Sequence, residues 1–311
     1  MPPAGRFVRR HATFEPDADS GSRPAGSLHS NAAELTPRRA VPNVRLRMDH
    51  LTVGEYWNGN AEAWTKLARA GYDVYRDQLN TPAFLALLPP VSGLSGLDLG
   101  CGEGHNTRQV ARLGATMTGL DIAEIFIRHA RTEEARAPLG ITYHHASAVE
   151  LPYAAGSFDF VTAFMSLMDI PEITDVLAGT FRALRAGGFL QFSITHPCFN
   201  PPHRRNCRDE HGHTYAIEVG DYFVDARGRV DEWIFGSAPR ADRDRLPKFR
   251  VPRFHRPLGE WINLLLAAGF QIEHVAEPRP TSAALSQYPS LQDADVAAYF
   301  LHVRVRKPAT A

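Results

Sequence analysis

Cysteine and long apolar runs are both scarce in this sequence. Only three of its 311 residues are cysteine (Cys101, Cys198 and Cys207), so any disulfide scheme leaves one thiol unpaired. This odd number favours a reducing compartment, and we expect a cytoplasmic location. No apolar run approaches the roughly 20 residues that a membrane-spanning helix needs, and the N-terminus lacks the apolar segment of a signal peptide. A disulfide-stabilised secreted scaffold and a membrane partner are therefore not expected.

An excess of charge of either sign is also absent. Lys and Arg together number 34, Asp and Glu together number 34, and the formal net charge is zero. Because a protein that follows the phosphates of a nucleic acid is usually basic, we do not expect nucleic acid as a partner. With 44% hydrophobic and 22% charged residues, the composition is typical of a globular protein with a large core. It leaves the oligomeric state open between a monomer and a homodimer.

The first 47 residues differ in composition from the rest of the chain. They are rich in Arg, Pro, Ser and Ala and show no sustained apolar period, which predicts a disordered tail over residues 1–47. Acidic residues interrupt the arginines, so the composition favours a dispensable extension over a targeting segment. The patterned domain is predicted to span residues 48–311.

From residue 51 onward, predicted helices and strands alternate. Helices are expected over 62–71, 81–88, 105–113, 122–135, 171–184 and 257–268, and strands over 97–99, 115–120, 141–145, 158–165, 189–195, 270–275 and 299–305. The segment 158–165 is nearly all apolar, as expected of a parallel strand that is covered on both faces. This order predicts an α/β fold with a doubly wound sheet, whose ligands bind at the carboxyl ends of the strands.

A glycine-rich turn follows the first of these strands. The run Gly96-Leu-Asp-Leu-Gly-Cys-Gly-Glu-Gly104 ends in three alternate glycines, and Gly119-Leu-Asp121 closes the next strand. A dinucleotide fingerprint needs a glycine where His105 stands, and a Walker loop needs a Gly-Lys pair that the sequence lacks. The turn therefore predicts a pocket for a nucleoside without phosphate, where a ligand approaches the main chain. Asp98 can help to orient an ammonium group, and Asp121 can accept both hydroxyls of a ribose.

These motifs resemble those of class I (Rossmann-like) S-adenosylmethionine-dependent methyltransferases, in particular the small-molecule group (methyltransferase type 11-like). The resemblance covers about residues 50–307 and implies S-adenosyl-L-methionine as cofactor and S-adenosyl-L-homocysteine as product. It also implies a mostly parallel seven-stranded sheet with helices on both faces, an N-terminal helical lid and an insertion after strand five. Family members often carry an acid and a small residue after the third strand, and Ser147-Ala148 departs from that pattern. By this resemblance, the cofactor is held by Asp98, Gly100, Gly102, Gly104, Asp121, Ile122, Ser147, Ala148 and Phe164.

An aromatic pair, Tyr56 and Trp57, precedes the sheet. In related methyltransferases such side chains cover the donor, where a π face attracts the cationic sulfur. The same pair next to Trp64 would equally fix a helix onto the sheet, and both interpretations stay open. Tyr56, Trp57 and Met168 are predicted to contact the substrate.

The regular pattern is interrupted over residues 197–256. This segment is rich in proline and charged residues, with strand-like pieces at 215–219 and 222–224. Because it leaves the sheet at the ligand-bearing edge, we expect it to fold over the site with the first helices and to select the acceptor.

Transfer of a methyl group to some acceptors needs a general base. A phenol or carboxylate can react as its anion, whereas an alcohol or a protonated amine must lose a proton, for which histidine is suited at neutral pH. His196, at the end of the fifth strand, is the first candidate, His255 is the second and Asp169, after the fourth strand, is the third. Either histidine could instead cap a chain end or hydrogen-bond a carbonyl.

Three further patterns in or next to the insertion are weaker. Asn200-Pro-Pro-His203 resembles a signature of enzymes that methylate amines of nucleic-acid bases, but that signature belongs at the end of the fourth strand. The arginines of the insertion are mixed with acids, and a few of them could bind a carboxylate or phosphate on a small acceptor. We assign no metal site, because the histidines and cysteines near the start of the insertion lack the paired spacing of a zinc knuckle. These residues are His196, Cys198, His203, Cys207, His211 and His213.

The sequence therefore predicts an S-adenosylmethionine-dependent methyltransferase that acts on an O or N atom of a small-molecule acceptor. An RNA or protein methyltransferase is the first alternative, and a non-catalytic S-adenosylmethionine-binding module is the second.

Overall fold

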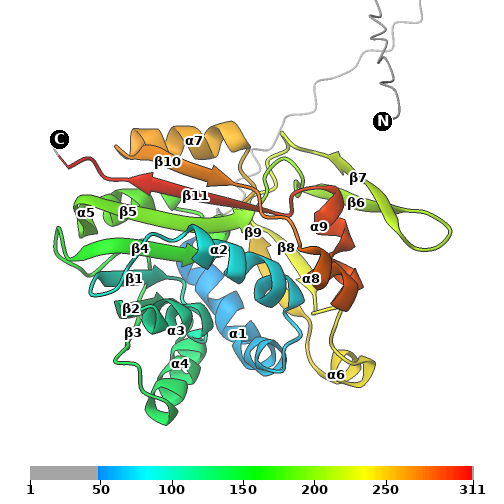
Figure 1. Ribbon diagram of the computed structural model, residues 1–311, viewed down its shortest axis with the longest axis horizontal. Helices are drawn as coiled ribbons and strands as arrows, with labels where there is room; N and C mark the ends of the chain where they lie inside the picture. The colour runs from blue at the N-terminus through cyan, green and yellow to red at the C-terminus, as the bar shows by residue number, and fades with distance from the viewer. Residues whose placement is uncertain (1–47, 310–311) are drawn as a thin grey trace, which may run out of the picture. The chain divides into compact units, whose positions relative to one another are not determined.

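One seven-stranded sheet organises the residues that the computed structural model describes, 48–309 (Figure 1). The tail predicted over residues 1–47 lies outside the described residues. The strand order is β10-β11-β5-β4-β1-β2-β3. Strand β11 runs antiparallel to β5 and β10, and the other neighbours are parallel, which confirms the predicted doubly wound sheet. The strands are β1 (Ser95–Leu99), β2 (Thr116–Asp121), β3 (Thr142–His145), β4 (Phe158–Phe164), β5 (Leu184–Thr195), β10 (Gln271–Ala276) and β11 (Phe300–Arg306).

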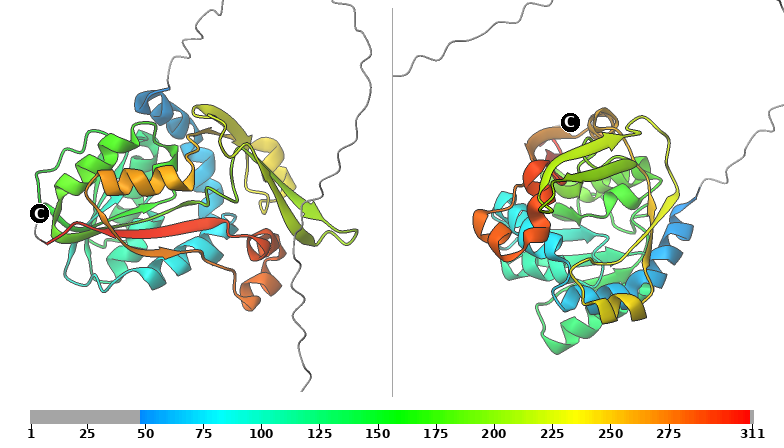
Figure 2. Two further views of the ribbon diagram at one scale, coloured as in Figure 1. Left: turned by 90° about the horizontal axis from the view of Figure 1, so that it is seen from above. Right: turned by 90° about the vertical axis from the view of Figure 1, so that its right-hand side faces the viewer.

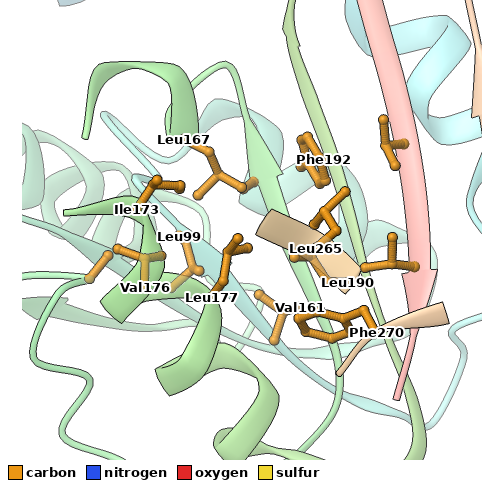
Figure 3. Packing of buried hydrophobic residues seen from close by; sticks show 14 of the residues in the cluster. Leu99, Val161, Leu167, Ile173, Val176, Leu177, Leu190, Phe192, Leu265 and Phe270 are labelled. Carbon is orange, nitrogen blue, oxygen red and sulfur yellow. The ribbon is translucent and has the colours of Figure 1, made fainter. Parts of the chain in front are cut away.

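Helices cover both faces of this sheet (Figure 2). Because side chains alternate along a strand, neighbouring residues of β4 enter different cores. Phe160 packs with the helices of one face. Val161 packs with Leu99, Val176 and Leu265 on the other face, and Figure 3 shows this cluster. The first face carries α2 (Thr81–Leu87), α3 (His105–Arg112) and α4 (Glu124–Arg136), and the second carries α5 (Ile173–Ala183) and α7 (Leu258–Ala267).

The first helix begins earlier than predicted. It spans α1 (His50–Arg69), whereas the apolar spacing indicated only 62–71. The helical turns that the prediction missed contain glycine and asparagine. Both residues have a low helix propensity, but here they make contacts with other parts of the fold. Gly54 lies against Ile122, whose Cγ1 would be 2.9 Å from an added Cβ. The Asn60 amide hydrogen-bonds the backbone of Arg250, in strand β9 (Phe249–Arg253), as donor and as acceptor, at 2.9 Å each. Tertiary contacts therefore stabilise a segment whose local sequence does not predict a helix.

The insertion forms two antiparallel pairs of strands. They are β6 (His203–Arg208) with β7 (Thr214–Gly220) and β8 (Arg229–Trp233) with β9 (Phe249–Arg253), and α6 (Arg240–Arg245) lies between β8 and β9. The strand-like piece at 215–219 is confirmed within β7, but the piece at 222–224 is a turn, because Asp221 has a left-handed φ of 58°.

The two pairs lie differently with respect to the sheet. The β6–β7 hairpin extends away from it (Figure 2), whereas β9 packs on α1 through a cluster that includes Leu67 and Phe249. All these elements lie within the predicted insertion, and its bounds at 197–256 stay a prediction.

The short elements between the main ones were not predicted. A π-helix, η1 (Arg76–Asn80), precedes α2, and a single 3₁₀ turn, η2 (Leu167–Asp169), follows β4. Helices α8 (Ser282–Gln287) and α9 (Gln292–Val296) with the turn η3 (Pro289–Leu291) precede β11. None of the helices within residues 48–309 is both long enough and apolar enough to cross a bilayer.

Candidate active site

A cavity of about 1050 Å³ opens where the parallel strands end. Gly100 after β1, Asp121 at the end of β2, Met165 after β4 and Pro197 after β5 all line it. The carboxyl ends of parallel strands meet at one edge of a sheet, so the fold itself brings these residues together. Small-molecule sites have volumes of roughly 300–1,000 Å³. The cavity is therefore large enough for a nucleoside together with a second small ligand.

The glycine turn after β1 leaves its backbone open to the cavity. Gly100 and Gly102 both line the cavity with left-handed φ angles of 67° and 55°. A side chain at Gly100 would collide with Ser166, whose Cβ lies 2.4 Å from the position of an added Cβ, whereas nothing lies within 4 Å of that position at Gly102. Gly104 is not part of the cavity wall, because it begins α3 and faces Tyr143. The open space at Gly102 is where a ligand can approach the main chain.

Two buried carboxylates flank this turn. Asp121 Oδ2 accepts a hydrogen bond from the Gly102 N–H and Oδ1 accepts one from the Ala123 N–H, both at 2.8 Å. Burial raises the pKa of Asp121, and these N–H groups oppose the rise. Each carboxylate oxygen can accept a second hydrogen bond, which suits the two hydroxyls of a ribose.

The Asp98 carboxylate is held by two threonine hydroxyls. Its Oδ2 accepts from the Thr107 hydroxyl at 2.6 Å and its Oδ1 from the Thr162 hydroxyl at 2.8 Å. Burial raises the pKa of Asp98 to about 7. It lines the cavity, and its predicted contact with an ammonium group stays a prediction.

The other residues predicted to bind the cofactor and the substrate divide between the cavity and the surface. Tyr56 is not part of the cavity wall, because its ring packs under the Arg250 guanidinium, 4.9 Å away. Trp57 lies edge-on to Trp64 at 5.4 Å and reaches the cavity as well, so it serves both as core and as wall. Residues of these predictions that line the cavity are Ile122, Ser147, Ala148, Phe164, Trp57 and Met168.

His196 has no free ring nitrogen. Its side chain is only 2% exposed and is not part of the cavity wall. Its Nε2 lies 2.7 Å from Glu277 Oε1, and because a carboxylate accepts, Nε2 donates. Its Nδ1 accepts from the Cys198 N–H at 3.1 Å. The first candidate for the base is therefore held outside the cavity with both nitrogens engaged.

His255 and Asp169 do line the cavity. His255 Nε2 lies 2.9 Å from the Tyr222 carbonyl oxygen and must donate to it, which leaves Nδ1 as the atom that can accept a proton. Burial lowers the pKa of His255, so the neutral ring predominates at neutral pH. Asp169 is 5% exposed, and its carboxylate has no hydrogen-bond partner among residues 48–309. Burial raises its pKa to about 7, and the charges of Arg253 and Arg256 oppose the rise.

The structure adds two residues that the sequence analysis missed. His50, in the first turn of α1, lines the cavity with Nδ1 3.5 Å from Glu172 Oε2. Arg256 is 3% exposed and donates to the Ile170 carbonyl at 2.7 Å and to the Pro171 carbonyl at 3.0 Å. It thereby joins the end of the insertion to the segment that carries Asp169. Neither residue lies in a recognisable motif, so the sequence alone held no signal for them.

The histidines and cysteines of the insertion do not converge on one point. Within residues 48–309, no three His, Cys, Asp or Glu side chains are arranged to hold a metal ion. His203 instead pairs with Glu218, Nε2 to Oε1 at 2.9 Å. Cys101, Cys198 and Cys207 are free thiols.

Comparison with known proteins decides the family. A family model described as a methyltransferase domain matches residues 97–192. The crystal structure of an S-adenosylmethionine-dependent methyltransferase from Mesorhizobium loti is 31% identical, with a TM-score of 0.58, over 72% of this chain and 96% of that chain. The chain belongs to the S-adenosylmethionine-dependent methyltransferases. Residues of this methyltransferase fit the family's cofactor, because the open backbone at Gly102 and the carboxylate of Asp121 lie on one wall of the cavity.

Curated relatives match a shorter part of this methyltransferase. A ubiquinone biosynthesis O-methyltransferase from Aromatoleum aromaticum is 37% identical over 106 residues, which are 33% of this chain and 45% of the relative. A 27-O-demethylrifamycin SV methyltransferase from Amycolatopsis mediterranei is 34% identical over 113 residues, 35% of this chain and 42% of the relative. The chain thus spans less than half the length of these relatives. The structure of the [4+2]-cyclase SpnF, 16% identical with a TM-score of 0.54 over 84% of this chain and 97% of that chain, shares the fold alone.

Proposed function

We propose that this methyltransferase transfers a methyl group from S-adenosylmethionine to an O or N atom of a small molecule. One observation carries the proposal: a single cavity of about 1050 Å³ has the glycine turn and Asp121 in its wall, and also Asp169 and His255. A nucleoside-binding surface and groups that can accept a proton therefore face the same space. The names of the curated relatives, which are O-methyltransferases, favour oxygen over nitrogen.

The glycine turn, Asp121 and Trp57 form the part of the cavity wall that we assign to the methyl donor and call the donor end. When bound, S-adenosylmethionine supplies a methyl group on a sulfonium, which is already a good leaving group. We infer that Asp121 binds the ribose, that the backbone at Gly100 and Gly102 approaches the methionine part, and that Trp57 covers it. The chain's own task is then to align the acceptor and to exclude water.

We infer that Asp169 accepts the proton of the acceptor. Its carboxylate has no protein partner among residues 48–309, and burial brings its pKa to about 7, near the optimum for a base at neutral pH. His255 is the second candidate, because Nδ1 is its free nitrogen. His196 is no longer the first, since a base must have a free atom that faces the acceptor.

Two measurements test the function. Calorimetry with S-adenosylmethionine measures donor affinity, and a screen of small phenols, alcohols and amines follows the release of S-adenosylhomocysteine. We expect Asp169→Asn to slow turnover at least about 100-fold with little change in donor affinity. Asp175→Asn, a change on the far side of α5 that is outside the cavity wall, should retain the wild-type turnover.

The alternatives give different results in the same experiments. Donor binding without turnover of any acceptor would indicate a non-catalytic module. Competition by RNA that weakens with salt would indicate a nucleic-acid substrate. The cytoplasmic location stays a proposal, supported by the three free thiols.

A further inference from the structure

The wall formed by β8 and β9 holds two guanidinium groups against one carboxylate. Arg229 Nε lies 3.0 Å from Asp231 Oδ1, and Arg253 Nε lies 2.7 Å from Oδ2 of the same aspartate. All three residues line the cavity. The adjacent Glu232 is drawn to another arginine, Arg250, at 3.5 Å. One carboxylate cannot neutralise two guanidinium groups, so this wall keeps one positive charge in excess.

The two arginines differ in how many donors they have left. Arg229 uses all three of its nitrogens, with Nε and Nη2 on Asp231 and Nη1 on the Pro202 carbonyl at 3.0 Å. Arg253 uses only Nε, and among residues 48–309 its two terminal amino groups have no hydrogen-bond partner. Its side chain is 30% exposed, on the wall of the cavity. The open side of this planar fork therefore has the geometry that binds a carboxylate through two parallel hydrogen bonds.

Arg253 also lies close to the inferred base. Strand β9 packs against the turn η2, which carries Asp169. Of the nearby charges, that of Arg253 has the largest effect on the Asp169 carboxylate. Aromatic side chains, Trp233, Phe254 and Trp261, complete the wall around them. An acceptor that contacts both residues must therefore have an anionic group, an apolar body and a nucleophilic atom.

We propose that the acceptor is a small aromatic or otherwise apolar acid whose carboxylate is bound by the terminal amino groups of Arg253. Its methylated O or N atom then lies on the side of Asp169. The proposal rests on the proposed function, since it names the acceptor of that site. A carboxylate suits the single excess charge, whereas a phosphomonoester carries about −1.5 to −2 and would leave negative charge uncompensated beside Asp169 and Asp231.

Matched pairs of probes test the proposal on the full chain loaded with S-adenosylhomocysteine. Calorimetry compares 4-hydroxybenzoate with 4-hydroxybenzyl alcohol, 2-aminobenzoate with aniline, and benzoate with phenyl phosphate. We expect 4-hydroxybenzoate and 2-aminobenzoate to bind at least about tenfold more tightly than their uncharged partners, and benzoate to bind more tightly than phenyl phosphate. Arg253→Gln should remove this preference and leave the affinity for S-adenosylhomocysteine within about twofold.

Arg240→Gln is the matched control. Arg240 lies in α6 outside the cavity wall, pairs with Asp244 rather than with a residue of the wall and is 88% exposed, so its loss should preserve the preference for acids. Arg253→Lys should keep part of the preference, because it retains the charge without the fork.

The possible outcomes separate a carboxylate site from a phosphoester site, and both from a failure of the proposed function. Acids that bind no more tightly than their neutral partners, or an Arg253→Gln variant with the preference intact, would overturn the carboxylate site. Tighter binding of phenyl phosphate than of benzoate would assign a phosphoester instead. Failure to bind S-adenosylmethionine or its product at all would refute the proposed function itself, which is a separate result.

Discussion

Replacing Asp169 by asparagine should stabilise this protein at high pH and not at low pH. Asp169 is 5% exposed and its carboxylate has no hydrogen-bond partner among residues 48–309, so the ionised form is poorly solvated in the folded state. Burial raises its pKa from 3.8 to about 7. Asparagine has nearly the same shape and no charge to bury.

The sign of this pH effect follows from the number of protons that the folded and the unfolded chain bind. Between pH 3.8 and 7, the folded chain holds the Asp169 proton and the unfolded chain does not. The contribution of Asp169 to stability is therefore fully present at low pH and is lost as the pH rises toward the folded pKa. One pH unit corresponds to about 1.4 kcal/mol for one proton, so about two units between pH 5 and the folded pKa give a loss of about 3 kcal/mol. Asp169→Asn has no carboxylate at this position, so the variant does not lose this stability as the pH rises.

Urea unfolding at pH 5 and pH 8, without added donor, measures the effect. The free energy of unfolding of Asp169→Asn minus that of the wild type should increase by about 3 kcal/mol between the two pH values. Asp225→Asn, at an aspartate whose side chain is 73% exposed, controls for the loss of a surface carboxylate. A difference between Asp169→Asn and the wild type that is the same at both pH values would refute the raised pKa, and with it the inference that Asp169 acts as a base near neutral pH.

Three further predictions concern the donor end and His196. Asp121→Asn should weaken the binding of S-adenosylhomocysteine about 10–100-fold in calorimetry, because each hydrogen bond to a charged group contributes about 1.5–3 kcal/mol; unchanged affinity would remove Asp121 from the ribose site. Gly100→Ala should lower the free energy of unfolding by about 1–3 kcal/mol more than Gly102→Ala, because both substitutions strain a left-handed residue but only the first collides with Ser166; equal losses in urea titrations would contradict the packing argument. His196→Gln should keep turnover within about threefold of the wild type while losing about 1–3 kcal/mol of stability, and turnover that is slower by about two orders of magnitude at unchanged donor affinity would restore His196 as the base.

The glycine turn and Asp121, to which we assign the donor, could be placed at one edge of the sheet from the sequence because they are close together in it. The glycine turn and Asp121 lie in two short runs, each directly after a predicted strand. Parallel strands align their carboxyl ends whatever the details of side-chain packing, so a strand end in the sequence already has a place in the fold. The seven strands were predictable for the same reason, since their apolar pattern is local.

Helix α1 was only partly predictable, because its first turns are held by distant partners. Gly54 packs on Ile122 and Asn60 bonds to β9, and neither contact has a local signature. The π-helix η1 and helices α8 and α9 were missed because short elements have little periodicity of their own.

Our preference for Asp169 over His196 as the proposed base rests on the tertiary structure. Whether a histidine can accept a proton depends on which ring nitrogens remain free, and His196 is engaged by Glu277, 81 residues away in the sequence. We assign roles to Asp169 and Arg253 because both line the cavity, and because folding leaves the Asp169 carboxylate and the two terminal amino groups of Arg253 without a hydrogen-bond partner among residues 48–309.

The sequence by itself determined the family and the sheet, and it placed the glycine turn and Asp121 at one edge of that sheet, because these features depend on short runs and on strand order. The tertiary structure decided which titratable groups face the cavity and which arginine of the cavity wall keeps both terminal amino groups unpaired. Burial and pairing are properties of contacts between distant residues, and no local pattern encodes them.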